Sequence, residues 1–410
     1  METNVIELPN GLCVLHRYVP YTRTVHCGYV IDTGSRDDLL EESGMTHFIE
    51  HMVFKGTVKR KTFHILNYLE SVGGDLNAYT TKEKICLYAS MVSDYFERAT
   101  ELLTDIVFNS TYPEKEIVKE KQVISEEISM YRNAPDEAIF EDFDKLIFPN
   151  HSLGAPILGT RQTIQRFNQH NVVRHVRQNF TQHRIVLSIV GNVSLKRVKK
   201  AVDKYLADIH LPTAEREREA PPSLSAKQLD HPIQTEQAHE IIGGRAFGLK
   251  QSFHVPFILL NNMLGGPGMN SRLNLNIREK HGLTYSINSF YSPYQDSGIW
   301  GIYFACEPGN LQRIRKMVYK ELKELTDKTL GQIRLNQAKK QLIGQFTLGY
   351  ENLLNQMLGM AKDMLDYQRI QSFSSFVEEI ELISAAQLQE VAKRLFVEEE
   401  LSRLTYKQVG

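Results

Sequence analysis

The sequence predicts an α+β protein made of two homologous α/β-sandwich domains, each a mostly antiparallel sheet packed with helices. Three observations lead to this prediction. A segment rich in proline and charge, residues 211–235, interrupts the pattern near the middle of the 410 residues. On each side of it a strand runs directly into an amphipathic helix, and a second long helix follows. Strands grouped with helical hairpins favour sandwiches over a doubly wound sheet, and the repeated order indicates an internal duplication.

The domain boundaries follow from the central segment. We predict a first domain over residues 1–212, a linker over residues 213–235 and a second domain over residues 236–410. The central segment shows neither helical nor strand periodicity. Prolines together with alternating charges are typical of a solvated connector.

Two pairs of helices are expected at equivalent places in the halves. The strand-helix units are "ICLYASMVSDYFERATELLTDIV" and "WGIYFACEPGNLQRIRKMVYKELKEL", and their helices would be capped by Ser93 and Asn310. The long helices that follow are "EKEIVKEKQVISEEISMY" and "GQIRLNQAKKQLIGQFTL".

The composition limits the partners of the protein. It is 42% hydrophobic and 24% charged, as expected of a globular protein, and its net charge of -1 argues against nucleic acid or an acidic membrane as partner. No apolar run is long enough to span a membrane, and the N-terminal residues resemble neither a signal peptide nor a transit segment. The cysteines form no CxxC pair and are expected to be small buried residues in a reducing compartment. We therefore expect a cytoplasmic protein.

The stretch "SGMTHFIEHMVFKGT" carries the chemistry of the first half. Ser43 as N-cap and Gly56 beyond the end predict a helix over residues 44–55. His47 and His51 are four residues apart, so both imidazoles project from one face, and Glu50 falls on that face too. Two such histidines are a preformed pair of zinc ligands, and the carboxylate beside them can accept a proton from water. The order His-x-x-Glu-His is the inverted zinc-peptidase motif. Because so short a motif can also occur by chance, the assignment needs further support.

A catalytic zinc needs a third protein ligand, and the long helix that contains "VISEE" offers two adjacent glutamates. Glu127 shares the inward stripe with Glu120 and with Val123 and Ile124, whereas Glu126 points toward solvent. We therefore expect Glu127 to be the ligand. Glu120 is either a supporting carboxylate that fixes an imidazole tautomer or an ordinary surface glutamate.

The second half serves as a control for this prediction. Its long helix, residues 331–348, contains no Asp or Glu, and "FILLNNMLGG" has no histidine. Only one metal site per chain is expected.

Together "THFIEHMVFKGT", "GGDLNAYTTKE" and "VISEE" resemble the inverzincin zinc peptidases, the family of pitrilysin, insulin-degrading enzyme and the mitochondrial processing peptidase. The likeness extends over nearly the whole chain, through "NGL", "GAPILGT" and "VLSIVGNV", and indicates a short two-domain bacterial-type member. The resemblance implies that His47, His51 and Glu127 bind one Zn²⁺ per chain. It also implies that Glu50 is the general base and Glu120 the supporting carboxylate.

The resemblance implies two substrate-binding segments as well. "REKHGLTYSI" is similar to the Arg/Tyr segment of the family, in which Arg278 would hold a backbone carbonyl and Tyr285 would donate to the oxyanion. "GGDLNAYTTKE" is similar to the edge strand that pairs with the substrate, with Asn77 and Ala78 contacting its backbone. From the residues alone, Arg278 would be a surface charge, Tyr285 a strand aromatic and "GGDLNAYTTKE" a plain core strand.

The expected function is a zinc metalloendopeptidase that cleaves small unfolded peptides within an enclosed chamber. Because this chain carries both the zinc motif and the Arg/Tyr segment, the resemblance implies a homodimer in which each chain has its own site. The alternatives are a specific presequence-type processing peptidase and a non-catalytic scaffold subunit, and a heterodimer with an inactive sibling also stays open.

Overall fold

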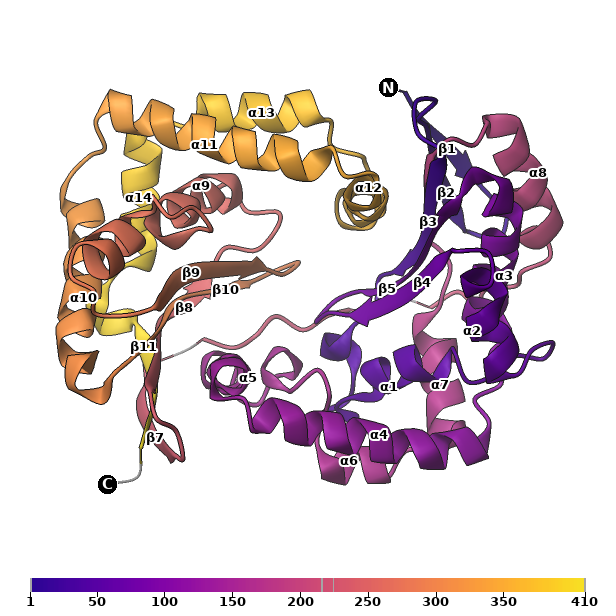
Figure 1. Ribbon diagram of the computed structural model, residues 1–410, viewed down its shortest axis with the longest axis horizontal. Helices are drawn as coiled ribbons and strands as arrows, with labels where there is room; N and C mark the ends of the chain where they lie inside the picture. Colours follow the sequence, from indigo (N-terminus) through magenta and orange to yellow (C-terminus); the bar gives the residue numbers. More distant parts are fainter. Residues whose placement is uncertain (1, 215–216, 224, 409–410) are drawn as a thin grey trace. The chain divides into compact units, whose positions relative to one another are not determined.

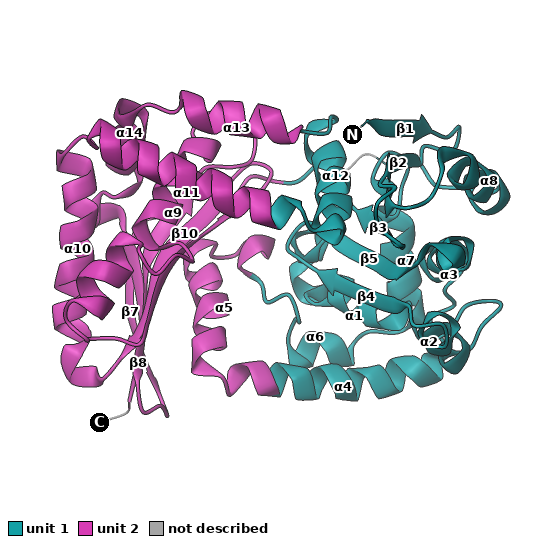
Figure 2. Cartoon of the chain, turned by 45° about the horizontal axis from the view of Figure 1, so that its top comes forward, with its two compact units in different colours: residues 1–129, 155–218, 349–371 teal, residues 130–154, 219–348, 372–410 magenta. Residues whose placement is uncertain are grey.

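The structure, a computed structural model, describes residues 2–214, 217–223 and 225–408, which fall into two compact units (Figures 1 and 2). Unit 1 consists of residues 1–129, 155–218 and 349–371, and unit 2 of residues 130–154, 219–348 and 372–410. Parts of the predicted linker and of the domain ends, residues 1, 215–216, 224 and 409–410, lie outside the described residues. Each unit combines one mixed sheet with helices on both of its faces.

Unit 1 is built on a six-stranded sheet with the order β1-β2-β6-β3-β5-β4. Neighbouring strands are antiparallel except β2 and β6, which are parallel. The central strand β6 is buried along its whole length, because helices cover both faces of the sheet. The strands are β1 (Thr3–Glu7), β2 (Cys13–Tyr18), β3 (Thr24–Ile31), β4 (Asp75–Thr80), β5 (Ile85–Val92) and β6 (Ile185–Gly191).

Unit 2 is built on a five-stranded sheet with the order β7-β11-β8-β10-β9. Here β7 and β11 are the parallel pair, and the other neighbours are antiparallel. The strands are β7 (Gln228–Ile233), β8 (Ala238–Ala246), β9 (Ser286–Pro293), β10 (Gly298–Cys306) and β11 (Ser402–Gln408).

The two sheets repeat one connectivity. Without β1, each sheet holds its strands in the chain order first, fifth, second, fourth, third, and the parallel pair occupies the same place. The mostly antiparallel α+β architecture predicted from the sequence is confirmed, and the shared order is what an internal duplication would leave.

The helices of unit 1 cover the two faces of its sheet unequally. Most of them pack on one face, where side chains such as Tyr29, Phe48 and Phe96 form the main core. Among the described helices, α12 covers the opposite face, through Met357, Met360 and Ala361. The helices are α1 (Met45–Met52), α2 (Thr62–Glu70), α3 (Phe96–Phe108), α4 (Glu114–Arg132), α6 (Arg161–Gln165), α7 (Gln169–Asn179), α8 (Leu195–Tyr205) and α12 (Leu353–Tyr367).

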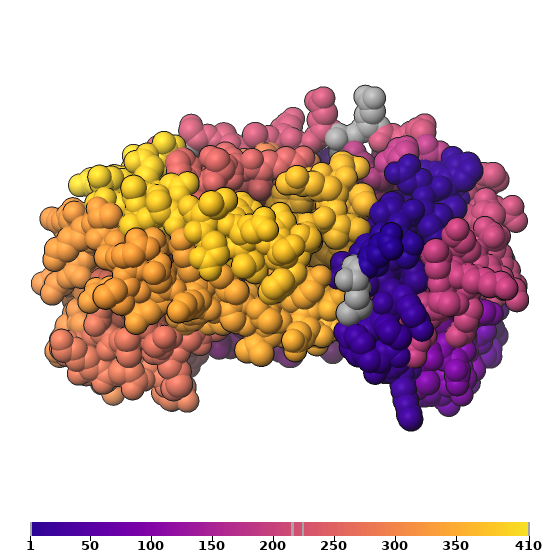
Figure 3. Space-filling model, turned by 90° about the horizontal axis from the view of Figure 1, so that it is seen from above, coloured from indigo at the N-terminus to yellow at the C-terminus, as the bar shows by residue number. Residues whose placement is uncertain are grey.

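Unit 2 has the same division between its faces. One face carries the core around Phe257, Trp300 and Phe304, and the other is covered by α5 through Ile139, Phe143 and Ile147. On the surface of this unit α11 and α13 lie side by side, with Phe346 stacked on Phe373 (orange and yellow in Figure 3). The helices are α5 (Pro135–Ile147), α9 (His254–Gly265), α10 (Leu311–Asp327), α11 (Gln332–Tyr350), α13 (Phe373–Leu382), α14 (Ala385–Leu395) and the π-helix η5 (Asn274–Glu279).

The covering helices α5 and α12 are exchanged between the halves of the sequence. Helix α5 lies between β5 and β6 of unit 1 in the chain but packs on the sheet of unit 2. Helix α12 lies between β10 and β11 of unit 2 in the chain but packs on the sheet of unit 1. The compact units therefore differ from a simple division of the chain at the predicted linker.

Three local predictions are wrong. Residues 228–233 of the predicted linker form β7, in which Pro232 is tolerated because β7 is an edge strand. Ser93 does not cap α3, since residues 93–95 form a 3₁₀ turn before it. Asn310 precedes α10 as predicted, but its side chain makes no capping hydrogen bond.

No described helix has the length and apolarity that a bilayer crossing requires. The four cysteines are free thiols; Cys27, Cys86 and Cys306 are buried as predicted, and Cys13 is half-buried.

Candidate functional site

Helix α1 carries the His-x-x-Glu-His motif, and it is shorter than the sequence predicts. It begins at Met45 behind Gly44, whose φ of 93° lies in the left-handed region, and it ends at Met52. A Cβ at Gly44 would lie 2.6 Å from the carbonyl oxygen of Leu158, so only glycine fits there. The prediction of Ser43 as N-cap is wrong.

The side chain of Asp38 takes over the capping of α1. Its carboxylate accepts hydrogen bonds from the backbone N–H of Gly44 at 3.0 Å and from the backbone N–H of Thr46 at 3.1 Å. Because the first N–H groups of a helix have no partner inside it, this buried carboxylate fixes the start of α1 two residues before His47.

His47, His51 and Glu127 form the one group among the described residues whose side chains could hold a metal ion together. Their ligand atoms all lie within 4.8 Å of one another. Nε2 of His47 is 4.0 Å from Oε1 of Glu127, and Nε2 of His51 is 3.7 Å from Oε2 of the same carboxylate. The adjacent Glu126 is exposed. Helical geometry therefore selected the glutamate that the structure brings to the two histidines.

Glu120 lies beside His51. One oxygen of its carboxylate contacts the ring of His51, and the other contacts a lysine. Oε1 accepts from Nδ1 of His51 at 2.8 Å, and Oε2 lies 2.7 Å from Nζ of Lys55. With Nδ1 carrying the proton, Nε2 of His51 presents its lone pair toward Glu127. This position of Glu120 is the one expected of a supporting carboxylate.

The pKa values of the two histidines are shifted in opposite directions. Burial, together with the neighbouring His51, lowers the pKa of His47 to about 3, so His47 is neutral at pH 7. For His51 burial acts in the opposite sense to its neighbours, but the hydrogen bond to Glu120 and the nearby carboxylates raise its pKa. Nδ1 of His47 is buried and has no hydrogen-bond partner in the described part of the chain.

This donor set fits zinc. Two imidazoles and one carboxylate are a common ligand set of catalytic zinc, which keeps a further position open. Neutral His47 and the fixed tautomer of His51 both leave a ring nitrogen free to bind a cation.

Glu50 lies beside the metal group, but its side chain is hydrogen-bonded to a residue outside that group. Its Oε2 accepts a hydrogen bond from Oγ1 of Thr80 on β4. Burial raises the pKa of Glu50, and the bond to Thr80 opposes that rise. A carboxylate placed next to such a group is suited to accept and release a proton.

A cavity of about 320 Å³ opens beside Glu50 and His51 and is bounded by β4. Phe54, Leu66 and Leu76 give it an apolar wall. Asn77 and Ala78 also line it, and β4 is the edge strand of the sheet, so one side of its backbone has no partner strand among the described residues. Both predicted edge-strand residues thus lie next to the metal group.

The Arg/Tyr segment belongs to unit 2. Arg278 lies on η5, and its guanidinium is 5.3 Å from the centre of the Tyr285 ring. The side chain of Tyr285 is among the most exposed aromatics of the chain, with a relative exposure of 83%. These residues form a pair of their own.

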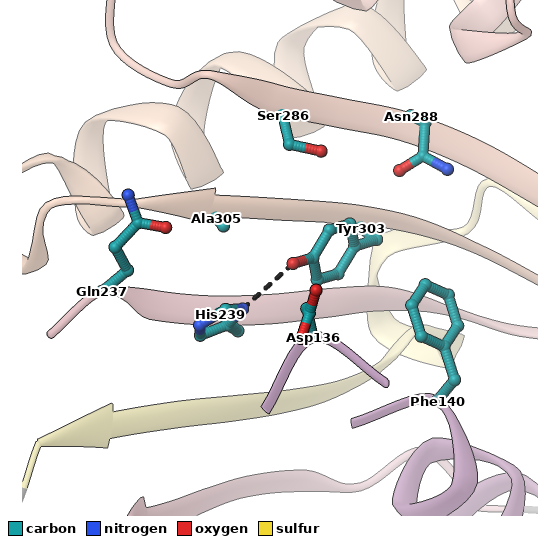
Figure 4. A pocket seen from close by; sticks show the side chains of 8 residues that line it. All are labelled: Asp136, Phe140, Gln237, His239, Ser286, Asn288, Tyr303 and Ala305. Carbon is teal, nitrogen blue, oxygen red and sulfur yellow. Dashed lines mark hydrogen bonds between the residues drawn. The ribbon is translucent and has the colours of Figure 1, made fainter. Parts of the chain in front are cut away.

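Unit 2 also contains a larger cavity, of about 570 Å³, between the start of α5 and the sheet (Figure 4). His239 and Tyr303 lie at its floor with Nδ1 and the hydroxyl 3.0 Å apart, and Phe140 forms one wall. Burial lowers the pKa of His239. Since its residues do not form a metal-binding group, the smaller cavity of unit 1 is the better candidate for chemistry.

Three residues of the site were not identified from the sequence. Thr80 follows Leu76 and Ala78 at strand spacing, so alternation along β4 could have placed it on the same face. Lys55 was assigned to the end of a helix and carried no signal of its contact with Glu120. Asp38 lies in a segment with no periodicity, and its capping role depends on the tertiary structure.

Comparison with known families identifies the two halves of the chain separately. Residues 13–161 match the model of insulinase, peptidase family M16, and residues 166–342 match the model described as the peptidase M16 inactive domain. The first match contains the whole metal group, and the second contains Arg278 and Tyr285.

Similar proteins of the same length are found in several bacteria. The chain is 33% identical to a zinc protease of Bacillus subtilis named YmxG, over 95% of both chains. It is 31% identical to a zinc protease of Rickettsia bellii, over 96% of this chain and 95% of that one. A protease from Helicobacter pylori has the same fold, with a TM-score of 0.92 at 18% identity over 99% of both chains. The chain therefore belongs to the M16 family of peptidases, the pitrilysin-type inverzincins, as a two-domain bacterial-type member.

Proposed function

We propose that the protein is a zinc metalloendopeptidase that hydrolyses peptide bonds of small unfolded peptides within an enclosed chamber. The observation that carries this proposal is the group of His47, His51 and Glu127 with Glu50 beside it, in a chain of the M16 family. The relatives named zinc proteases support the same activity.

His47, His51 and Glu127 would hold one zinc ion per chain. When bound there, zinc supplies a Lewis acid that polarises the scissile carbonyl and makes water more acidic. Glu50 takes the proton of the attacking water and delivers it to the leaving amine. Glu120 and Lys55 keep the ring of His51 in the tautomer that binds metal.

The substrate would add to the free edge of β4, where Asn77 and Ala78 contact its backbone. Main-chain pairing places the peptide along the cavity beside Glu50 and reads no particular side chain. Arg278 would hold a backbone carbonyl, and Tyr285 would donate to the oxyanion. The exposed side chain of Tyr285 is available for such a contact.

Two variants test the catalytic assignment. Glu50→Gln should retain zinc and lose turnover of a quenched fluorescent peptide library. Glu127→Gln should lose zinc and activity together, and Glu126→Gln, altered at the adjacent exposed residue, should keep both. The measurements are metal content by mass spectrometry and cleavage in the same samples.

Each outcome has a definite meaning. A Glu50→Gln protein with full activity would remove Glu50 from the mechanism. Zinc in the wild type without cleavage of any peptide would favour a scaffold subunit. A wild type without zinc would contradict the metal site itself.

We also propose that the protein is a cytoplasmic homodimer. Both the zinc motif and the Arg/Tyr segment are present in one chain, so no second kind of subunit is needed to supply either. The free thiols are compatible with a reducing compartment. Light scattering after size exclusion should give twice the chain mass, and a monomer under active conditions would contradict the dimer.

A further inference from the structure

Strand β4 presents two different faces to its surroundings. Leu76 and Ala78 pack on the main core of unit 1 and line the cavity of the metal group, while Tyr79 packs toward α12 on the other face. Because side chains alternate along a strand, Thr80 shares the face of Leu76 and Ala78. The hydroxyl of Thr80 therefore lies on the side of the sheet that α1 covers.

The hydroxyl of Thr80 meets the carboxylate of Glu50 there. Oγ1 of Thr80 donates to Oε2 of Glu50 at 2.5 Å, and within the described residues this is the one hydrogen bond that the Glu50 side chain makes. Oε1 accepts no hydrogen bond from the part of the chain that the structure describes. A glutamate side chain has three rotatable bonds, so a single fixed oxygen decides which way the free one points.

The contact joins two elements with separate tasks. Glu50 lies on α1, between the two histidines of the metal group, and Thr80 ends the edge strand β4. The bond therefore ties the orientation of the carboxylate to the strand whose free edge borders the cavity.

We propose that Thr80 is a positioning residue for catalysis: its hydroxyl holds one oxygen of Glu50, so that the other oxygen stays directed at the water to be activated. The proposal rests on the proposed function of Glu50 as the base. It adds that the strand that would align the peptide also orients the base, so the base and the peptide are placed by the same strand.

The matched variant is Thr80→Val. Valine has the same branched shape and suits a strand equally well, so it removes the hydroxyl and little else. Thr80→Ser restores a hydroxyl. Thr24→Val is the control, since Thr24 lies on β3 of the same sheet and its hydroxyl meets that of Thr22 at 2.9 Å, away from the residues that line the cavity.

The test is steady-state cleavage of one fluorescent peptide, with zinc content and melting temperature measured on the same preparations. Thr80→Val should lower kcat about tenfold and leave KM within about twofold. A general base contributes about 100-fold or more to the rate, and the variant keeps the base but loses part of its orientation. Thr80→Ser should recover most of the rate. Thr24→Val should keep kcat within about twofold of the wild type, and all variants should hold wild-type zinc.

The results separate this role from a structural one and from failure of the proposed function. Unchanged kcat in Thr80→Val, or an equal loss in Thr80→Ser, would overturn the role of the hydroxyl. A change in KM alone would also overturn it, because it would assign Thr80 to substrate binding. If Glu50→Gln remains active, the proposed base is wrong, whatever Thr80→Val shows.

Discussion

At the scale of single residues, Glu120 links His51 of the metal group to Lys55. Its carboxylate is 3% exposed and contacts His51 on one side and Lys55 on the other. Burial alone would raise the pKa of Glu120, but its bonds to His51 and Lys55 lower it, so the group is an anion at neutral pH.

Replacing this anion by an amide should weaken the metal site. Glu120→Gln keeps the size of the side chain but removes the charge that favours His51 as a ligand. We expect zinc affinity to fall about 10- to 100-fold, the usual effect of losing a partner of a metal-binding histidine. Competition with a chelating dye measures it, with Glu126→Gln as control; equal affinities for all three proteins would contradict the role of Glu120.

The main residues of the metal group could be predicted because they depend on helical spacing. His47 and His51 share a face at four residues, and Glu127 was chosen over Glu126 by phase. The same phase argument was wrong for Val123, which is 48% exposed, and right for Ile124, which is buried. Contacts such as Lys55 with Glu120 join distant segments, and no local pattern encodes them.

At the scale of elements, α12 is the helix whose removal should harm unit 1 most directly. Met357 is fully buried against the sheet of unit 1, although more than 160 residues separate it from the last strand, β6, which ends at Gly191. Met357→Ala should lower the free energy of unfolding by about 2–4 kcal/mol, through lost burial and the cavity left behind.

Denaturant unfolding followed by circular dichroism measures this loss. Met269→Ala, at a side chain that is 68% exposed, is the control and should change stability by less than about 0.5 kcal/mol. An equally small effect at Met357 would show that α12 does not support the sheet.

Helix α12 also carries a carboxyl group that should make stability depend on pH. Burial raises the pKa of Asp363 to about 6, the backbone N–H of Gln371 opposes the rise, and Asp366 adds to it. The folded pKa lies above the unfolded value of about 3.9, so the protonated group stabilises the fold below about pH 4. That contribution is lost as pH rises through about 4 to 6.

Asp363→Asn should therefore raise the melting temperature at pH 7.5 and change it little at pH 4.5. The gain at pH 7.5 is expected to be on the order of 1–2 kcal/mol after screening by solvent. Asp208→Asn, in an exposed position, is the control. The same gain at both pH values would argue against a buried charge as the cause.

Which sheet a helix covers could not be predicted from its sequence. An amphipathic pattern shows that one face of α5 or α12 is buried, but both sheets offer an apolar surface of the same kind. The pattern therefore predicts the helix and leaves its partner open. The same holds for β7, whose exposed and polar residues look like a connector until β11 pairs with it.

At the scale of the whole molecule, the two halves of the chain should depend on each other. A fragment of residues 1–212 contains the complete sheet of unit 1 but lacks α12, so the apolar side chains around Leu15, Val30 and Val190 would be exposed. A fragment of residues 213–410 contains the sheet of unit 2 but lacks α5.

Each fragment alone should bind the dye ANS and aggregate, as expected of exposed apolar surface. Co-expressed fragments should purify together with little dye binding, similar to the full chain. A fragment of residues 1–212 that stays monomeric and binds no dye would contradict the exchange. It would favour independent domains divided at residue 212.

The duplication itself could be predicted, because both halves preserve strand-helix units in the same order. The exchange of helices could not, since it is a symmetric choice between two nearly equivalent sheets. Only the packing of particular side chains, Phe143 on one sheet and Met357 on the other, decides it.

The exchange has a consequence for the order in which the protein is made. The sheet of unit 1 has all its strands once the ribosome has passed Gly191, but its covering helix begins only at Leu353. At about 5–20 residues per second, this face waits roughly 10–30 s for its cover. The sheet that α5 covers is also incomplete then, because its last strand, β11, begins only at Ser402. The nascent chain therefore exposes two apolar surfaces until synthesis is almost finished, and both are covered only in the final stage of translation.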